Sequence, residues 1–318
     1  MRGAGARDLI TLPRTLLMRR PTELPPRRVS RRLGLLFSVP TMLLLIAMVL
    51  GGGPAGWPGG APATVLRFSG SAHGLYLVIS EQPLRDLQAV APRLAAKLLA
   101  RRTTIVLTPG SPALTPPGAA VGTAFFTSYA EFIGRLQRHA IPPGVRAVAY
   151  DPELWRATPF LERLDPKRYM ALFAGAAHRH GYAAILMPGR DLLAAASSCR
   201  QQPGEDLDAA FLRCGLAGEA ARLSQVFEIQ TAPVELSSTE LRGFAAACAK
   251  QARAANPSVV LIATLSTQTG AGWVNGWQLA RAAAAVRPYV QGFQLNLTRR
   301  STRAAVSFLL RTFSALRG

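Results

Sequence analysis

The sequence predicts an α/β fold of the (β/α)8 class, a TIM-like barrel, complete or irregular. Short apolar runs typical of buried strands alternate with helical stretches over about 245 residues, close to the usual length of this fold. The runs start about 20 to 45 residues apart, which suits successive βα units and therefore a parallel sheet. No glycine-rich dinucleotide fingerprint follows the first run, which disfavours an open doubly wound sheet.

Seven clear strand-like runs and one weaker run follow one another along the chain. The clear runs are 75–80, 103–108, 146–150, 183–187, 226–230, 259–264 and 290–297, and the weaker one is 121–126. Helical stretches are expected between them at 83–101, 129–139, 166–180, 238–256, 274–286 and 302–316. Because strands that alternate with helices build a barrel or an open parallel sheet, the number of units favours the barrel.

Three of these strands have one bulky apolar face and one face of small or polar residues. Residues two apart on a strand share a face, and the small-or-polar faces are Ala147, Ala149, Asp151 and Glu153; Val226, Glu228 and Gln230; and Gly292, Gln294 and Asn296. In a barrel such faces point into the lumen, and their polar members come last. We expect these polar side chains to converge at the C-terminal mouth, where sites on this fold are built.

Carboxylates at these positions are the strongest functional signal. Glu228 lies between Phe227 and Ile229, and a buried carboxylate is costly unless it is paired or used. The Cα atoms of Asp151 and Glu153 are expected about 7 Å apart, a value that carboxyl separations in inverting and retaining glycosidases bracket. For each strand alone, an ion pair with an arginine is an equal alternative; for the three together, a ligand site is favoured.

The segment from Ala149 to Trp155, followed by Thr158-Pro159 and Glu162, resembles the strand-end region of TIM-barrel glycoside hydrolases. Asp151-x-Glu153 is similar to the end of the chitinase-type D-x-D-x-E signature, although Ala149 stands where the first Asp would be. The later segments 227–235, 262–270 and 292–297 resemble uncharacterised exported bacterial barrel proteins of this glycosidase-like kind, a group that implies no established activity.

The resemblance implies a role for each candidate residue. Glu153 would be the general acid, Asp151 would orient it, and Glu228 would be the second carboxylate. The remaining candidates would bind sugar: Gln230, Gln294 and Asn296 through hydroxyl groups, and Trp155 by stacking. We expect no cofactor, and no Cys/His spacing resembles a metal site. Cys199 and Cys214 could close a loop, which would leave one thiol free or paired between chains.

The N-terminal region predicts export. Nine arginines in residues 1–32 precede an uncharged apolar run at 33–50, so we expect a basic cytoplasmic N-terminus and a transmembrane or signal segment. A Gly/Pro linker at 51–70 leads into an extracytoplasmic domain at 71–318. The apolar run is either an uncleaved membrane anchor or an export signal cleaved near Ala63, where Ala61-Pro62-Ala63 supplies small residues.

The net charge and the composition limit the classes of molecule that this protein is expected to bind. The formal net charge is +20, but aromatic residues are few and not interleaved with the basic ones, so we expect no nucleic acid. The expected partner is a polysaccharide or an anionic cell-envelope polymer, besides the membrane at 33–50. Three functions stay open: an exported glycoside hydrolase, a non-catalytic glycan-binding barrel with a degenerate site, and a tethered structural barrel. The sequence leaves the oligomeric state open.

Overall fold

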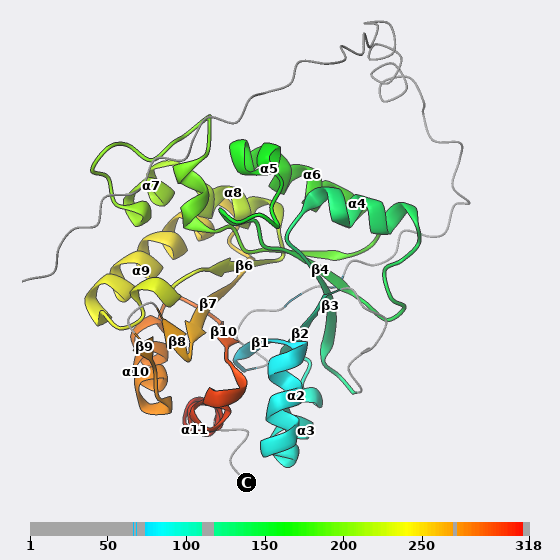
Figure 1. Cartoon of the computed structure of the whole chain (residues 1–318), viewed down its shortest axis with the longest axis vertical. Coiled ribbons are helices and arrows are strands. Elements are labelled where there is room, and N and C mark those ends of the chain that lie inside the picture. The colour runs from blue at the N-terminus through cyan, green and yellow to red at the C-terminus, as the bar shows by residue number, and fades with distance from the viewer. Residues whose placement is uncertain (1–65, 67, 69–73, 110–117, 270–271, 314–318) are drawn as a thin grey trace, which may run out of the picture. The chain divides into compact units, whose positions relative to one another are not determined.

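The computed structural model describes residues 66, 68, 74–109, 118–269 and 272–313, which all belong to one compact unit of the chain (Figure 1). The predicted N-terminus at 1–32, the apolar run at 33–50 and most of the linker lie outside the described residues and stay predictions. Within the described part of the chain, the helices are too short or too polar to cross a bilayer.

Eight parallel strands form a closed barrel, which confirms the predicted fold class and its weaker strand at 121–126. The barrel strands are β1 (Tyr76–Ser80), β2 (Thr104–Thr108), β3 (Val121–Phe126), β4 (Ala147–Tyr150), β5 (Ala183–Leu186), β6 (Val226–Ile229), β7 (Val260–Ser266) and β10 (Gly292–Asn296). The barrel closes where β10 pairs with β1. A Cβ at Gly292 would lie 2.5 Å from the Cβ of Tyr76, so only glycine fits at the start of this seam. A small hairpin of β8 (Gln268–Thr269) and β9 (Gly272–Trp273) follows β7.

Helices follow the strands along the chain, at the predicted places and at some additional ones (Figure 1). The helices are α2 (Glu81–Val90), α3 (Pro92–Leu99), α4 (Tyr129–Gln137), α5 (Phe160–Leu164), α6 (Pro166–Arg179), α7 (Leu207–Arg213), α8 (Leu216–Leu223), α9 (Ser238–Ala255), α10 (Gly276–Val286) and α11 (Thr302–Thr312), with 3-10 turns η1 (Arg190–Ala194), η2 (Ala232–Val234) and η3 (Arg299–Ser301). The single helix predicted at 83–101 is wrong. It is two helices, because Pro92 lacks an amide hydrogen and keeps Ala91 out of helical geometry (φ −142°, ψ 66°).

Two hydrophobic layers confirm the predicted strand faces. Val148, Tyr150 and Phe227 pack outward with the helices, and the Tyr150 ring stacks on Phe173 of α6 with centroids 4.8 Å apart. Ala147 belongs to a separate apolar cluster inside the lumen, together with small and branched residues of the other strands. The lumen is thus filled mostly with apolar side chains, and the carboxyl and amide groups on its faces lie toward the C-terminal ends of the strands.

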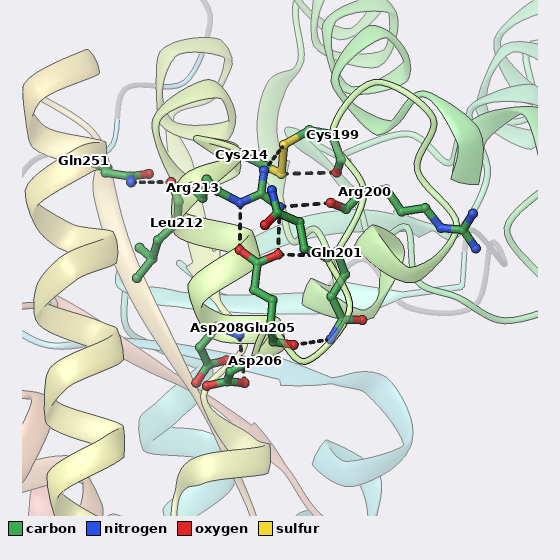
Figure 2. Close-up of polar contacts among 11 residues, drawn as sticks. Cys199, Arg200, Gln201, Glu205, Asp206, Asp208, Leu212, Arg213, Cys214 and Gln251 are labelled. Atoms are coloured by element: carbon green, nitrogen blue, oxygen red, sulfur yellow. Dashed lines mark hydrogen bonds and ion pairs between the residues drawn. A yellow bond between two sulfur atoms is a disulfide. The ribbon is translucent and has the colours of Figure 1, made fainter.

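The chain between β5 and β6 makes an excursion, residues 190–213, which the sequence did not predict (Figure 2). A Cys199–Cys214 disulfide joins its middle to the residue that ends α7, while Cys248 is free and buried. Arg213 reinforces this link, because its guanidinium pairs with Glu205 at 2.7 Å and donates to the Arg200 carbonyl at 2.9 Å. These contacts all lie between residues 199 and 214, so they close this part of the excursion on itself at the end of α7.

Glu162 is a buried carboxylate that stabilises the N-terminus of α4. Its two oxygens accept from the Ser128 and Tyr150 hydroxyls at 3.0 and 2.7 Å and from the Tyr129 and Ala130 amides at 2.8 and 3.1 Å. Glu162→Gln places an NH2 group against donors, so we expect the free energy of unfolding to fall by about 2–4 kcal/mol in denaturant titration.

Glu131→Gln is the matched control, because Glu131 lies in the same first turn but its pair with Arg135 is surface-exposed. Its loss should change the free energy of unfolding by less than about 1 kcal/mol. Equal effects of the two substitutions would contradict a structural role for the buried carboxylate.

Candidate functional site

One cavity of about 350 Å³ opens at the C-terminal ends of β4, β6, β7 and β10. Six of the seven predicted site residues line it: Asp151, Glu153, Glu228, Gln230, Gln294 and Asn296. The other lining residues are Arg190, Asp191, Leu207, Ala232, Pro233 and Thr264. The barrel therefore brings together side chains that lie up to 145 positions apart in the sequence.

A single amide nitrogen joins the first two carboxyl groups. Gln230 Nε2 donates to Asp151 Oδ1 at 3.1 Å and to Glu153 Oε1 at 2.8 Å, and it also lies 3.1 Å from the Met187 carbonyl. Because both carboxyl oxygens contact one nitrogen, they are at most about 6 Å apart, close enough for the charge of one to act on the other. Gln230, predicted as a sugar ligand, instead spends its amide hydrogens on the acids.

Burial and mutual repulsion raise the pKa values of this pair. The pKa of Asp151 is well above its usual range, first because burial penalises the charged form and then because Glu153, Glu228 and Asp191 repel a second negative charge. Burial also raises the pKa of Glu153, with a contribution from Asp191, while the hydrogen bond from Gln230 opposes the shift. These raised pKa values favour a protonated pair.

Glu228 is the deepest acid, with only 2% of its surface exposed. The Thr264 hydroxyl donates to its Oε1, whereas Oε2 has no hydrogen-bond partner among the described residues. Burial raises the pKa of Glu228 to about 8, and repulsion by Glu153 adds to the shift. In Gln294, Oε1 likewise lacks a partner within the described structure, and its nitrogen donates to Asn296 Oδ1 at 3.2 Å. Both residues line the cavity, and each has one buried oxygen that accepts no hydrogen bond from the described residues.

Arg190, Asp191 and Thr264 line the cavity although the sequence did not single them out. Asp191 Oδ2 accepts from the Leu154 amide at 3.2 Å, and burial raises its pKa. Arg190 pairs with Asp208 and lies over the Phe244 ring at 5.8 Å, so its charge is already partly compensated. The signal was present in Gly189-Arg190-Asp191, a charged pair that follows the fifth strand where a barrel places its site residues.

Trp155 and Glu162 lie apart from this cavity. The Trp155 side chain is absent from the cavity lining, is 41% exposed, and donates from Nε1 to Thr158 Oγ1 at 3.0 Å. The same Thr158 hydroxyl accepts from the Glu153 amide at 3.1 Å, so this segment positions the backbone of the predicted acid. Within the described residues, no group of three or more His, Cys, Asp or Glu side chains is placed to hold a metal ion.

Gly189 permits the close approach of Asp191 and Glu153. A Cβ at position 189 would lie 2.5 Å from Asp191 Oδ1 and 2.9 Å from Glu153 Cγ, so one of the two must move. We expect Gly189→Ala to lower the catalytic rate or the ligand affinity by about tenfold or more, because an ångström-scale displacement of a positioned group has this effect.

Gly243→Ala is the control, since a Cβ at this position on α9 meets nothing within 4 Å. It should leave function unchanged and raise the free energy of unfolding by about 0.5–1 kcal/mol. Full function of Gly189→Ala would show that the two acids need not approach so closely.

Comparison with known proteins adds little to this geometry. No family model matches the sequence, and no curated protein matches it. A solved structure with a related fold is the carboxyl transferase domain (Y628A) of Rhizobium etli pyruvate carboxylase with pyruvate, with 11% identity and a TM-score of 0.39. The match covers 77% of this chain and 47% of that chain, so the present chain spans less than half of that structure. At this similarity the match supports no functional argument.

Proposed function

We propose that this barrel is a glycoside hydrolase that acts on a cell-surface or extracellular polysaccharide. The observation that carries the proposal is the acid pair Asp151 and Glu153, which lies with Glu228 in a cavity at the strand ends. The pKa values of both acids of the pair are raised, which favours their protonated forms. A carboxyl group with a raised pKa is what a general acid requires near neutral pH.

Glu153 is the general acid of the proposed reaction, because it is the least buried of the predicted acids and so the most accessible to a leaving group. It donates its proton to the glycosidic oxygen as the bond between that oxygen and the anomeric carbon breaks. A water molecule adds its hydroxyl to the anomeric carbon and gives its proton to a carboxylate. Asp191 repels the charge of Glu153 and so favours its protonated form, while the Gln230 amide holds Glu153 beside Asp151.

Glu228 is the second carboxylate of the proposal. Ionised, it stabilises positive charge at the sugar ring or accepts the proton of the water. With a pKa of about 8 in the empty site, it must lose a proton before it performs either role at neutral pH. Gln294 and Asn296 supply the amide groups for sugar hydroxyls, and Trp155 is kept as an outlying stacking surface.

A non-catalytic glycan-binding barrel is the second candidate. It is favoured by the Gln230 amide, which already occupies one oxygen of each acid, and by Ala149, which leaves the first position of the chitinase-type signature without a carboxyl group. An anionic envelope polymer does not suit this cavity under either function, because four acids line it and the arginine in its described lining is already paired. Export, by an anchor or a cleaved signal at 33–50, belongs to both proposals.

A polysaccharide screen tests the proposal. The full chain is incubated with chromogenic glycosides and with neutral, N-acetylated and amino polysaccharides, and released reducing ends are measured, with the Glu153→Gln variant as the blank. Release by the wild-type protein alone supports hydrolysis. Binding to one of these glycans without release at any pH between about 4 and 8 would replace the hydrolase by the binding barrel.

A further inference from the structure

The charge of the cavity is unbalanced. Its titratable and charged side chains are Asp151, Glu153, Asp191, Glu228 and Arg190. The arginine pairs with Asp208, which does not line the cavity, and its guanidinium lies against the ring of Phe244. Four carboxyl groups therefore share about 350 Å³ with one arginine of the described lining, which acts on Asp191 but is ion-paired with Asp208.

A buried acceptor in this cavity has no partner. Glu228 Oε2 is shielded from solvent and accepts no hydrogen bond from the described residues, although Oε1 of the same group is bound by Thr264. Leaving a buried carboxyl oxygen without a donor destabilises the fold, because the oxygen loses its hydrogen bonds to water and gains none in return. A ligand that brings donors and positive charge would remove this cost and let the surrounding acids ionise.

Asp191 is the acid best placed to pair with such a ligand without taking part in the proposed catalysis. Asp151 and Glu153 are held by Gln230, whereas Asp191 is held from outside the pair through the Leu154 amide. The short distances from a Cβ at Gly189 to both acids place Asp191 Oδ1 on the Glu153 side of the loop. A cation at Asp191 would therefore lie close to the reacting acids as well.

We infer that the glycan of this site is an amino sugar polymer with free, protonated amines, and that Asp191 pairs with the ammonium group. That the ligand is a sugar rests on the proposed function. That it is positively charged rests on the cluster of carboxyl groups in the cavity. Gln294 and Asn296 serve the neighbouring hydroxyl groups. The same cation would favour the ionised form of Asp191, whose pKa is raised by burial, so binding of the amine should release a proton.

Calorimetry on the full chain tests the inference. The probes are tetramers of glucosamine and of galactosamine and their fully N-acetylated counterparts, titrated at about pH 6, where most sugar amines carry a proton although they are less basic than the Lys amine. We expect at least about tenfold tighter binding of one amino tetramer over its N-acetylated form, as a charge-assisted pair provides. We also expect proton release, seen as a binding enthalpy that changes between phosphate and imidazole buffers.

Asp191→Asn keeps an acceptor for the Leu154 amide and removes the charge. It should reduce the preference for the amino tetramer to within about threefold, while the exposed Glu240→Gln control keeps the wild-type preference. The wild-type proton release does not depend on how well the variant folds. Equal affinity for both tetramers, or proton release on adding CaCl2 alone without amino-tetramer binding, would overturn the inference.

The outcomes for the two proposals are separable. Cleavage of a neutral or N-acetylated glycan with no amine preference would leave the hydrolase standing and remove the amino sugar. Tight binding of an amino tetramer with proton release but without cleavage would keep the ligand and remove the hydrolase.

Discussion

Glu153→Gln is expected to lower the turnover number on a cleaved glycan by about 10²–10⁴-fold, the usual contribution of a positioned general acid. The amide keeps an oxygen for the bond from Gln230 Nε2, so the shape of the site is retained while the transferable proton is lost. The affinity for the glycan should change little, since the proton acts only as the leaving group departs. Reducing-end assays give the rate, and calorimetry gives the affinity.

Glu240→Gln is the matched control for this substitution. It makes the same chemical change on the exposed first turn of α9 and should leave both rate and affinity at wild-type values. The pH-rate profile distinguishes a proton donor from a residue that only supports the fold. Wild-type activity should fall at high pH as Glu153 loses its proton, and a purely structural residue would give no such fall. Undiminished turnover in Glu153→Gln would remove this residue from the mechanism.

Glu228→Gln is expected to abolish hydrolysis and at the same time to stabilise the fold at pH 8. The Glu228 pKa is about 8 in the folded chain against 4.5 for an unburied glutamate. The folded state therefore binds more protons between these values, and the free energy of unfolding falls as pH rises from about 4.5 to 8. The neutral amide of the variant would carry no such penalty, and its oxygen can still accept from Thr264.

Thermal unfolding at two pH values measures this effect. The midpoint of the variant should exceed that of the wild type by about 2–6 °C at pH 8 and should differ little near pH 4. Asp151 and Asp191 have pKa values raised in the same direction, so part of the slope with pH should survive. A variant less stable than the wild type at pH 8 would show that the Glu228 carboxyl is paired in the folded state.

The barrel and the polar strand ends could be predicted because their signals are local. Alternation along β4, β6 and β10 assigns each side chain to a face, and eight strands in succession determine which faces meet. The same alternation predicts that Glu228, Gln294 and Asn296 share the lumen face, and all three line one cavity in the structure. The two-residue alternation along each strand and the order of the strands were enough to predict these positions. In a closed barrel, one face of every strand must point into the lumen.

The remaining parts of the site depend on contacts that the regular alternation of residues along the strands does not reveal. Asp191 enters through an irregular turn after β5, whose path is set by Gly189 and by the 190–213 excursion. Gln230 lines the cavity as predicted, but its partners are two acids that follow β4, so it binds protein where a ligand was expected. Trp155 follows β4 on a loop, where strand alternation no longer assigns a direction.

The Cys199–Cys214 link has a consequence for how the protein is produced. It ties down the excursion that carries Arg190, Asp191 and Leu207, while the β-strands and their helices are joined without it. Thiol pairs of this kind form and persist in oxidising compartments. Protein made in a reducing cytosol can therefore form its barrel without the disulfide and leave one wall of the cavity poorly positioned. A low activity of such protein would then reflect the missing disulfide rather than the catalytic ability of the site.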